Sequence, residues 1–113
     1  MKFLIIDDDP FELLLAKKLV GLKYEVEGFT SIPESSWVRN NPFEIVLIDY
    51  HLGKGITAQH VLRVLQKDAG NTFKAYVLSN HVDEAQVAEL KSGGFTDVLF
   101  KPLTLEKIIE LLA

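Results

Sequence analysis

Glu44-Ile45-Val46-Leu47-Ile48-Asp49-Tyr50 is the stretch that decides the fold, because an unbroken apolar run ends there in a carboxylate. A short apolar run without alternation is typical of a strand buried on both faces of a parallel sheet. Asp49 then lies at the carboxyl end of its strand, where open α/β sheets place their ligand crevice. A second such run, Phe3-Leu4-Ile5-Ile6, ends in Asp7-Asp8-Asp9. Two buried strands that both end in acids indicate a scaffold for an acidic cluster.

Strands and helices are expected to alternate five times along the chain. The expected strands cover 2–6, 24–29, 44–50, 73–78 and 97–100, and the expected helices cover 10–21, 33–39, 57–67, 83–92 and 104–112. Right-handed crossovers between these units dictate a doubly wound parallel sheet. We therefore expect an α/β fold of the flavodoxin-like type, a (βα)5 three-layer sandwich of strand order 2-1-3-4-5. The strand over 24–29 alternates apolar and acidic residues and is expected at an edge.

The first helix has the clearest start signal. Asp9 is expected as its N-cap, Pro10 as its first residue and Glu12 as the partner in a capping box. The helix follows the spacing of Phe11, Leu14, Leu15, Lys18 and Leu19 to about Gly21. Thr57 and Thr104 are expected to cap the third and fifth helices. The least regular segment is 33–39, where Trp37 is expected in the core or at its rim.

Composition limits the classes of function. The 113 residues suit one domain over 1–113, with 48% apolar and 25% charged residues. A formal net charge of −4 without a basic stripe disfavours nucleic acid as a direct partner. The chain has no cysteine, which excludes disulfides and thiolate chemistry. No apolar run approaches membrane length and no signal peptide is recognisable, so we expect a soluble cytoplasmic protein without a membrane partner.

Polar residues of different kinds end four of the expected strands. Asp7-Asp8 follow the first strand, Asp49 ends the third, Ser79 the fourth and Lys101 the fifth. The first and third strands are neighbours at the topological switch point, so their acids should converge. Two carboxylates about 4 Å apart repel by roughly 4 kcal/mol at an effective dielectric constant of 20, which favours a bound cation such as Mg²⁺. Metal, ammonium and hydroxyl around one carboxylate suit phosphoryl transfer, with Asp49 as the nucleophile that forms an acyl phosphate.

Four motifs carry a resemblance to a known family. They are Ile6-Asp7-Asp8-Asp9-Pro10, Leu47-Ile48-Asp49-Tyr50-His51-Leu52, Leu78-Ser79 and Phe100-Lys101-Pro102. Together they resemble the response-regulator receiver domain of two-component and phosphorelay signalling, in the form of a single chemotaxis-regulator-like receiver. The resemblance covers essentially the whole chain. It implies that Asp49 accepts a phosphoryl group from a histidine kinase or a histidine phosphotransfer protein.

The resemblance also implies a role for each site residue. Asp8 and Asp49 would bind Mg²⁺, or Mn²⁺ in its place, with Asp7 acting through water and the backbone carbonyl of His51 as a further ligand. Lys101 would pair with the phosphoryl group, and Ser79 would hydrogen-bond it after a rearrangement. The Lys101–Pro102 bond is expected to be cis. Such a protein catalyses its own phosphorylation and dephosphorylation and is not a turnover enzyme.

The output of such a switch is a downstream protein target or a fused output domain. The reporting surface implied by the resemblance includes Gln86, Glu89, Lys91, Glu106, Lys107 and Glu110. Val98 stands where receivers often carry an aromatic residue, and the bulkier Asn80 where they carry a small one. Phe100 or a loop shift would then have to report phosphorylation. The loop over 53–57 lacks the common proline and Asp-Gly pair, and we expect it to be mobile and not to touch the chemistry.

Two other functions compete with the switch. One is a receiver-like module that binds proteins without phosphorylation, which Val98 and the unusual loop favour. The other is a phosphatase of the Asp-nucleophile class, suggested by Asp7-x-Asp9, but the chain is too short for a cap domain and Asp49 is on the wrong strand. His51 and His81 each follow a site residue by two positions, and either are exposed polar side chains or gate water at the acyl phosphate. His60 is expected to be solvated.

Overall fold

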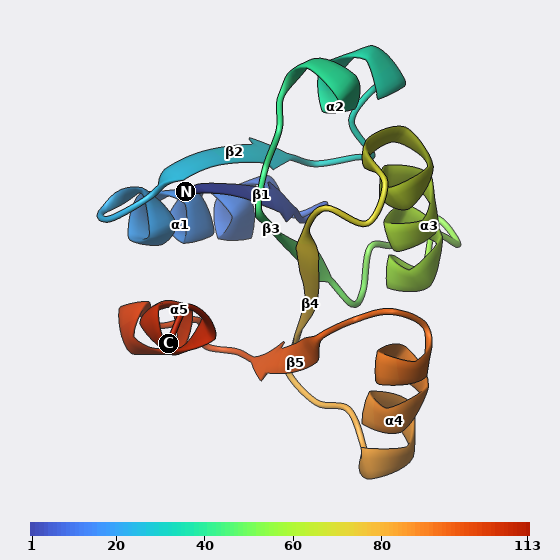
Figure 1. Cartoon of the computed structure of the whole chain (residues 1–113). Helices are drawn as coiled ribbons and strands as arrows, with labels where there is room; N and C mark the ends of the chain where they lie inside the picture. Colours follow the sequence, from blue (N-terminus) through green and yellow to red (C-terminus); the bar gives the residue numbers. More distant parts are fainter.

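Five parallel strands form one sheet in the order β2-β1-β3-β4-β5, as predicted, in a computed structural model that describes all residues 1–113 (Figure 1). The strands are β1 (Lys2–Ile6), β2 (Glu25–Phe29), β3 (Ile45–Asp49), β4 (Lys74–Ser79) and β5 (Asp97–Phe100). The helices are α1 (Pro10–Gly21), α2 (Ser35–Asn40), α3 (Ala58–Ala69), α4 (Glu84–Ser92) and α5 (Leu105–Leu111). No helix has both the length and the apolar character needed to cross a membrane.

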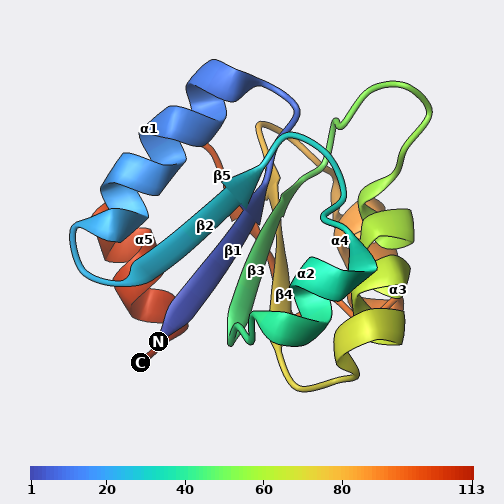
Figure 2. The same ribbon diagram turned by 90° about the horizontal axis from the view of Figure 1, so that it is seen from above.

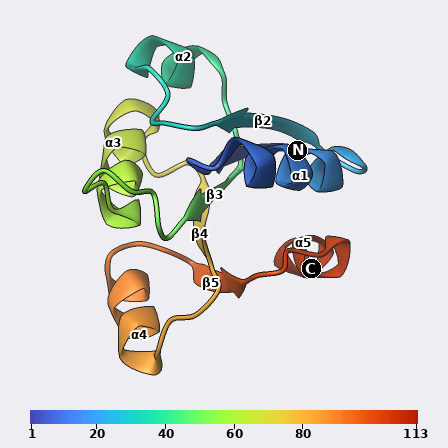
Figure 3. The same cartoon turned by 180° about the vertical axis from the view of Figure 1, so that it is seen from behind.

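The helices cover both faces of the sheet and divide the core into two layers. Figure 2 shows α1 and α5 on one face and α2, α3 and α4 on the other, and the view from behind in Figure 3 agrees. Alternate residues of the central strands serve the two layers. Ile5 and Leu47 pack towards α1 and α5, whereas Leu4 and Val46 pack towards α2, α3 and α4. The predicted three-layer sandwich is therefore confirmed.

Burial along the strands follows their place in the sheet. All five residues of β3 and the last four of β1 are buried, as the unbroken apolar runs predicted. In β2 the acidic side chains of Glu25 and Glu27 are exposed and the other three residues are half-buried, and β2 lies at the edge of the sheet as predicted. The parallel register pairs Asp49 with Leu78 and Ser79 with Phe100, so the polar strand ends share one edge of the sheet.

The start of α1 corrects one prediction. Asp9 caps the helix, with Oδ1 accepting hydrogen bonds from the backbone N–H groups of Phe11 and Glu12, and Pro10 is the first helical residue. The predicted capping box is wrong, because the Asp9 N–H donates to Asp7 Oδ1 (3.0 Å) and the Glu12 carboxylate contacts Lys101 instead. A tertiary ion pair has overridden a local helix-capping pattern.

A reciprocal capping box occurs elsewhere, at the start of α4. The Gln86 N–H donates to Asp83 Oδ1 and the Asp83 N–H donates to Gln86 Oε1, both at 2.8 Å. Thr57 and Thr104 cap α3 and α5 as predicted, each accepting a backbone N–H with its hydroxyl oxygen. These caps fix the start of each helix directly after a loop at the carboxyl edge of the sheet.

The apolar pattern of α1 is broader than the face that it buries. Leu13 and Val20 lie in the core, whereas Phe11, Leu14 and Leu15 remain 67%, 48% and 52% exposed. The apolar spacing therefore located the helix correctly, but it included apolar residues of the exposed face as well as those that face the core. Helix α3 has no such excess, since its predicted apolar residues Ala58, Val61, Leu62 and Leu65 are all buried.

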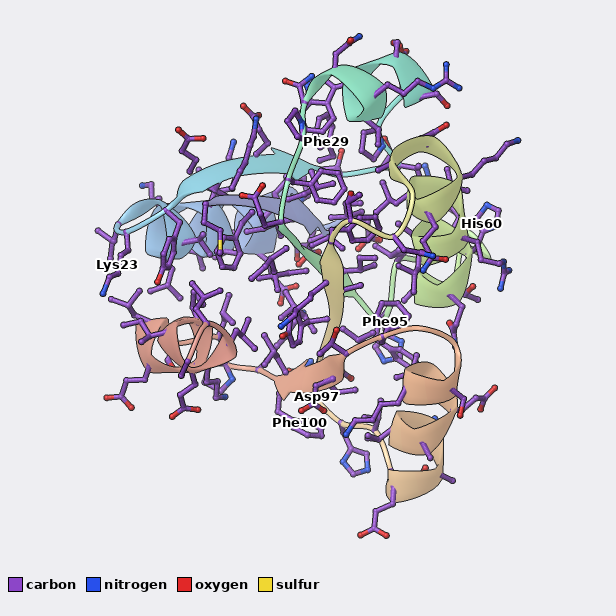
Figure 4. All side chains as sticks on the ribbon, viewed as in Figure 1. Lys23, Phe29, His60, Phe95, Asp97 and Phe100 are labelled. Carbon is purple, nitrogen blue, oxygen red and sulfur yellow. The ribbon has the colours of Figure 1, made fainter.

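The remaining side-chain predictions concern aromatic residues and histidine. Trp37 is partly buried and meets Phe29 edge-on with ring centroids 4.6 Å apart, which places it at the rim of the core. Figure 4 shows Phe29 beneath α2 and His60 pointing away from α3, in agreement with the exposure of His60. Helix α2 begins at Ser35 rather than Pro33, because Glu34 keeps an extended backbone.

Candidate functional site

Three carboxylates meet where β1 and β3 end. Asp7 and Asp8 follow β1 directly, and Asp49 is the last residue of the neighbouring strand. One oxygen from each lies within 4.8 Å of the others. Asp7 and Asp49 are only 2% and 5% exposed, while Asp8 is exposed. The cluster thus joins two buried acids to one that faces solvent.

The buried position of Asp7 changes its acidity. The pKa of this carboxyl is raised from 3.8 to about 6, mainly by burial, and the nearby charges of Asp49 and Glu12 act in the same direction. The hydrogen bond from the Asp9 N–H and the charge of Lys101 act in the opposite direction without cancelling the rise in pKa. The ionised form of Asp7 is therefore unfavourable in the folded chain, and a bound cation would relieve this cost.

Lys101 joins this cluster from the end of β5. Its Nζ lies 3.3 Å from Asp49 Oδ1 and 3.0 Å from Glu12 Oε2, and its side chain is 17% exposed. Burial by itself lowers the pKa of Lys101, but the hydrogen bond to Glu12 and the charge of Asp49 more than compensate, so that the pKa lies above 10.5. The side chain is therefore a fixed ammonium group shared by two carboxylates. The Lys101–Pro102 bond is cis, as predicted.

Ser79, at the end of β4, is buried, and its hydroxyl makes no hydrogen bond to the acids. Its hydroxyl donates to the carbonyl of His81 and accepts from the N–H of His81, each at 3.2 Å. The hydroxyl therefore ties the β4–α4 loop to the end of its own strand. The side chain of His81 is exposed. The structure thus places Ser79 on the expected strand end, while the hydroxyl makes no hydrogen bond to Asp49 or Lys101.

The loop after β3 lies closer to the acids than predicted. Gly53, Lys54 and Gly55 all have positive φ angles of 68°, 52° and 73°. A Cβ atom placed on Gly53 would lie 3.1 Å from Asp8 Oδ2, so the loop backbone adjoins this carboxylate. The expectation that the loop stays away from the chemistry is wrong. His51 begins the loop with an exposed side chain and pairs with Thr57 in an isolated antiparallel bridge.

Hollows open on both sides of the acidic cluster. One of about 410 Å³, beside α1 and the β5–α5 turn, is lined by Asp7, Glu12, Leu15, Ala16, Leu19, Leu78, Asn80, Lys101, Pro102 and Leu103. The other, of about 420 Å³, is lined by Ile6, Asp8, Pro10, Thr30, Ser31, Ile32, Leu52, Lys54, Ile56 and Val61. Asp7 and Asp8 thus face different hollows although they are adjacent in sequence. Each hollow therefore borders one of the two acids that follow β1, and Asp49 lines neither hollow.

Sequence reasoning assigned no role at the site to Glu12 or Gly53. Glu12 fitted a capping box, and only the fold brings β5, with Lys101, against the first turn of α1. Gly53 was recognised as part of a flexible loop, but its approach to Asp8 depends on the path of that loop. Asp8, Asp49 and Lys101 were predictable because each directly ends a recognisable strand or follows one.

Comparison with known proteins gives one family match. Residues 3–113 match the family model of the response regulator receiver domain. A CheY-like receiver domain protein from Methanospirillum hungatei JF-1 has 21% identity and a TM-score of 0.80, over 98% of this chain and 89% of that chain. Chemotaxis protein CheY4 of Vibrio cholerae has 19% identity and a TM-score of 0.84, over 98% and 94%.

A third solved structure is similar in fold and has ligands in its description. It is a response regulator from Burkholderia pseudomallei with a phosphorylated aspartic acid, a calcium ion and citrate, at 25% identity and a TM-score of 0.77, over 99% of this chain and 66% of that chain. No curated protein matches the chain.

Proposed function

The chain belongs to the response regulator receiver domain family, and from this premise we propose that it is a phosphorylation-activated switch in a two-component relay. Asp49 is the phosphoacceptor, and a histidine kinase or histidine phosphotransfer protein is the donor. The observation that carries the proposal is the Lys101 ammonium 3.3 Å from Asp49 Oδ1, beside a cluster of three carboxylates. A relay partner of this kind places the protein in the cytoplasm.

The acidic cluster fits Mg²⁺. Three carboxylates with oxygens within 4.8 Å of one another are hard ligands of the type that this ion prefers, with Mn²⁺ as an alternative. The pKa of Asp7 is raised mainly by burial and also by the charge of Asp49, so its ionised carboxylate is disfavoured, and a bound cation would offset this cost. Asp8 and Asp49 would hold the ion directly, with Asp7 acting through water and the His51 carbonyl as a further ligand. When bound, the ion supplies positive charge for the phosphoryl oxygens.

The protein groups account for the transfer step as follows. A carboxylate oxygen of Asp49 attacks the phosphorus of a phosphohistidine, an O–P bond forms and the P–N bond breaks. The electron pair stays on the imidazole nitrogen, which takes up a proton. Lys101 keeps its ammonium against Asp49 and so offsets the charge that the phosphoryl group brings. In dephosphorylation, a water oxygen attacks the phosphorus and the bond between the phosphorus and the Asp49 oxygen breaks. The electron pair returns to the Asp49 carboxylate, and inorganic phosphate leaves with the protons of the water.

Ser79 links this chemistry to the surface. To reach a phosphoryl group on Asp49, its hydroxyl must leave the backbone of His81, with which it makes two hydrogen bonds of 3.2 Å. Phosphorylation then releases the β4–α4 loop and favours a second arrangement of it. This is the proposed origin of the conformational response. The two hydrogen bonds to His81 define the resting arrangement of the hydroxyl.

The output surface is formed by α4, β5 and α5. Val98 is buried at 7% exposure in the core beside α4, so no aromatic side chain occupies this position on β5. Phe100, at 43% exposure, points away from the sheet in Figure 4 and is the aromatic residue of β5 that a partner can contact. We therefore assign the reporting role to Phe100 and the loop that Ser79 holds. The reader is a downstream protein or a fused output domain.

A small donor with a P–N bond tests the donor class. Phosphoramidate resembles phosphohistidine in this bond, and its consumption can be followed by ³¹P NMR in Mg²⁺. We expect the native protein to accelerate its breakdown through an acyl phosphate, whereas Asp49→Asn does not. Mg²⁺ binding measured by calorimetry without any phosphorylation would instead favour the module that binds proteins independently of phosphorylation.

A further inference from the structure

We propose that Glu12 is a positioning residue that competes with the phosphoryl group for the Lys101 ammonium and thereby restrains phosphorylation by small donors. The proposal rests on the proposed function of Asp49. Its starting point is that the Lys101 ammonium lies closer to the carboxylate of Glu12 than to that of the phosphoacceptor Asp49. Glu12 Oε2 lies 3.0 Å from Nζ, against 3.3 Å for Asp49 Oδ1.

The competition follows from the number of donors on the ammonium. Lysine has three N–H donors and no acceptor, and the resting chain directs two of them at Glu12 and Asp49. Phosphorylation replaces the single negative charge of the Asp49 carboxylate by about two negative charges and places three acceptor oxygens beside the same nitrogen. Lys101 therefore meets the new oxygens best when it gives up the bond to Glu12. Each phosphorylation has to draw the ammonium away from a carboxylate that is already paired.

The position of Glu12 strengthens this effect. The residue is in the first turn of α1, which the Asp9 cap and Pro10 fix at the edge of the acidic cluster. Glu12 and Lys101 line the same hollow of about 410 Å³, next to Asp7. The Glu12 side chain is 43% exposed and that of Lys101 is 17% exposed, so the carboxylate is the more accessible of the two charges in this hollow. Glu12 therefore adds a repulsive charge on the approach to Asp49.

Two matched variants separate the effect of the Glu12 charge from effects on folding and on net charge. Glu12→Gln keeps the shape of the side chain and an amide oxygen for Lys101, but removes the charge. Because the Glu12 side chain is 43% exposed, the change leaves no buried group unpaired. Glu27→Gln makes the same charge change on the exposed edge strand β2, away from the cluster. It controls for the effect of net charge on an anionic donor.

The experiment measures phosphorylation by acetyl phosphate in saturating Mg²⁺, in which the Asp49–phosphorus bond forms and acetate leaves with the electron pair of the broken P–O bond. We expect Glu12→Gln to lower the half-saturating acetyl phosphate concentration by about twofold to fivefold, the size of effect that one partly exposed ion pair allows. Glu27→Gln should behave as the native protein. The difference should shrink at high salt, which screens a partly exposed charge.

The outcomes distinguish this inference from the function on which it rests. A native protein that acquires phosphate while Glu12→Gln has the same or a higher half-saturating concentration overturns the competition alone. An equal change in Glu27→Gln also overturns it, since the effect would then be one of net charge. A native protein that acquires no phosphate from acetyl phosphate or phosphoramidate overturns the proposed function and this inference together.

Discussion

Replacing Asp7 by Asn should stabilise the metal-free protein at neutral pH. Asp7 is 2% exposed, and its Oδ1 accepts a hydrogen bond from the Asp9 N–H that an Asn oxygen can also accept. The substitution therefore removes the buried charge while it preserves the shape and the hydrogen bond. A residue that serves a metal site is here expected to reduce the stability of the fold without the metal.

The shifted pKa of Asp7 determines how much folding free energy its charge costs. Its rise from 3.8 to about 6 means that the folded state binds the proton more tightly than the unfolded state. Stability is then lost as the pH rises through this range, and one pKa unit corresponds to about 1.4 kcal/mol, so ionised Asp7 costs about 3 kcal/mol at pH 7. Near pH 4 most of the native carboxyl is protonated, and the cost falls below about 1 kcal/mol.

Urea unfolding in EDTA at pH 4 and pH 7 measures this cost. We expect Asp7→Asn to exceed the native protein by about 3 kcal/mol in unfolding free energy at pH 7, or roughly 10 °C in Tm, and by much less at pH 4. Mg²⁺ should stabilise the native protein more than the variant. Asp9→Asn is the control, because Asp9 is exposed and Asn caps helices equally well. An equal gain at both pH values, or no gain at pH 7, would refute the reasoning.

Three further predictions follow from other contacts. Gly28→Ala should lower the unfolding free energy by about 1–3 kcal/mol in urea titration, because the new Cβ would lie 2.7 Å from side-chain atoms of α1; an unchanged midpoint would contradict this. Lys107→Met should lower the unfolding free energy by about 1 kcal/mol, because the Lys107 Nζ donates to the two carbonyls on either side of Lys101, at 2.6 and 2.9 Å. Lys107→Arg should lower it by less, since arginine keeps N–H donors at this position. Alanine at both His51 and His81, which are exposed, should remove the pH dependence of dephosphorylation between about pH 6 and 8, and a profile equal to that of the native protein would reject the gating role.

The sheet and the acids could be predicted because their signals are local. Each central strand is a short apolar run, and a strand buried on both faces has no other common explanation in an alternating α/β chain. Asp49 and Lys101 are the last residue of one strand and the residue after another, so the strand order alone determined their edge of the sheet. The edge strand was also predictable, because acidic and apolar residues alternate along it.

The parts that were missed depend on contacts between distant segments. Glu12 satisfied a local capping rule, yet a charged partner 89 positions away in sequence offered a stronger interaction than a backbone N–H. The exposed row of Phe11, Leu14 and Leu15 has the same spacing as a core row, and sequence periodicity does not tell which row faces the sheet. The approach of Gly53 to Asp8 follows from three successive positive φ angles that composition alone does not specify.

The most direct test of the account is intact mass after incubation with acetyl phosphate. We predict a gain of about 80 Da, the mass of one phosphoryl group, in the native protein with Mg²⁺. The gain should vanish in EDTA and in Asp49→Asn. A gain that persists in Asp49→Asn would place the phosphoacceptor elsewhere, and no gain in the native protein with Mg²⁺ bound would contradict the switch.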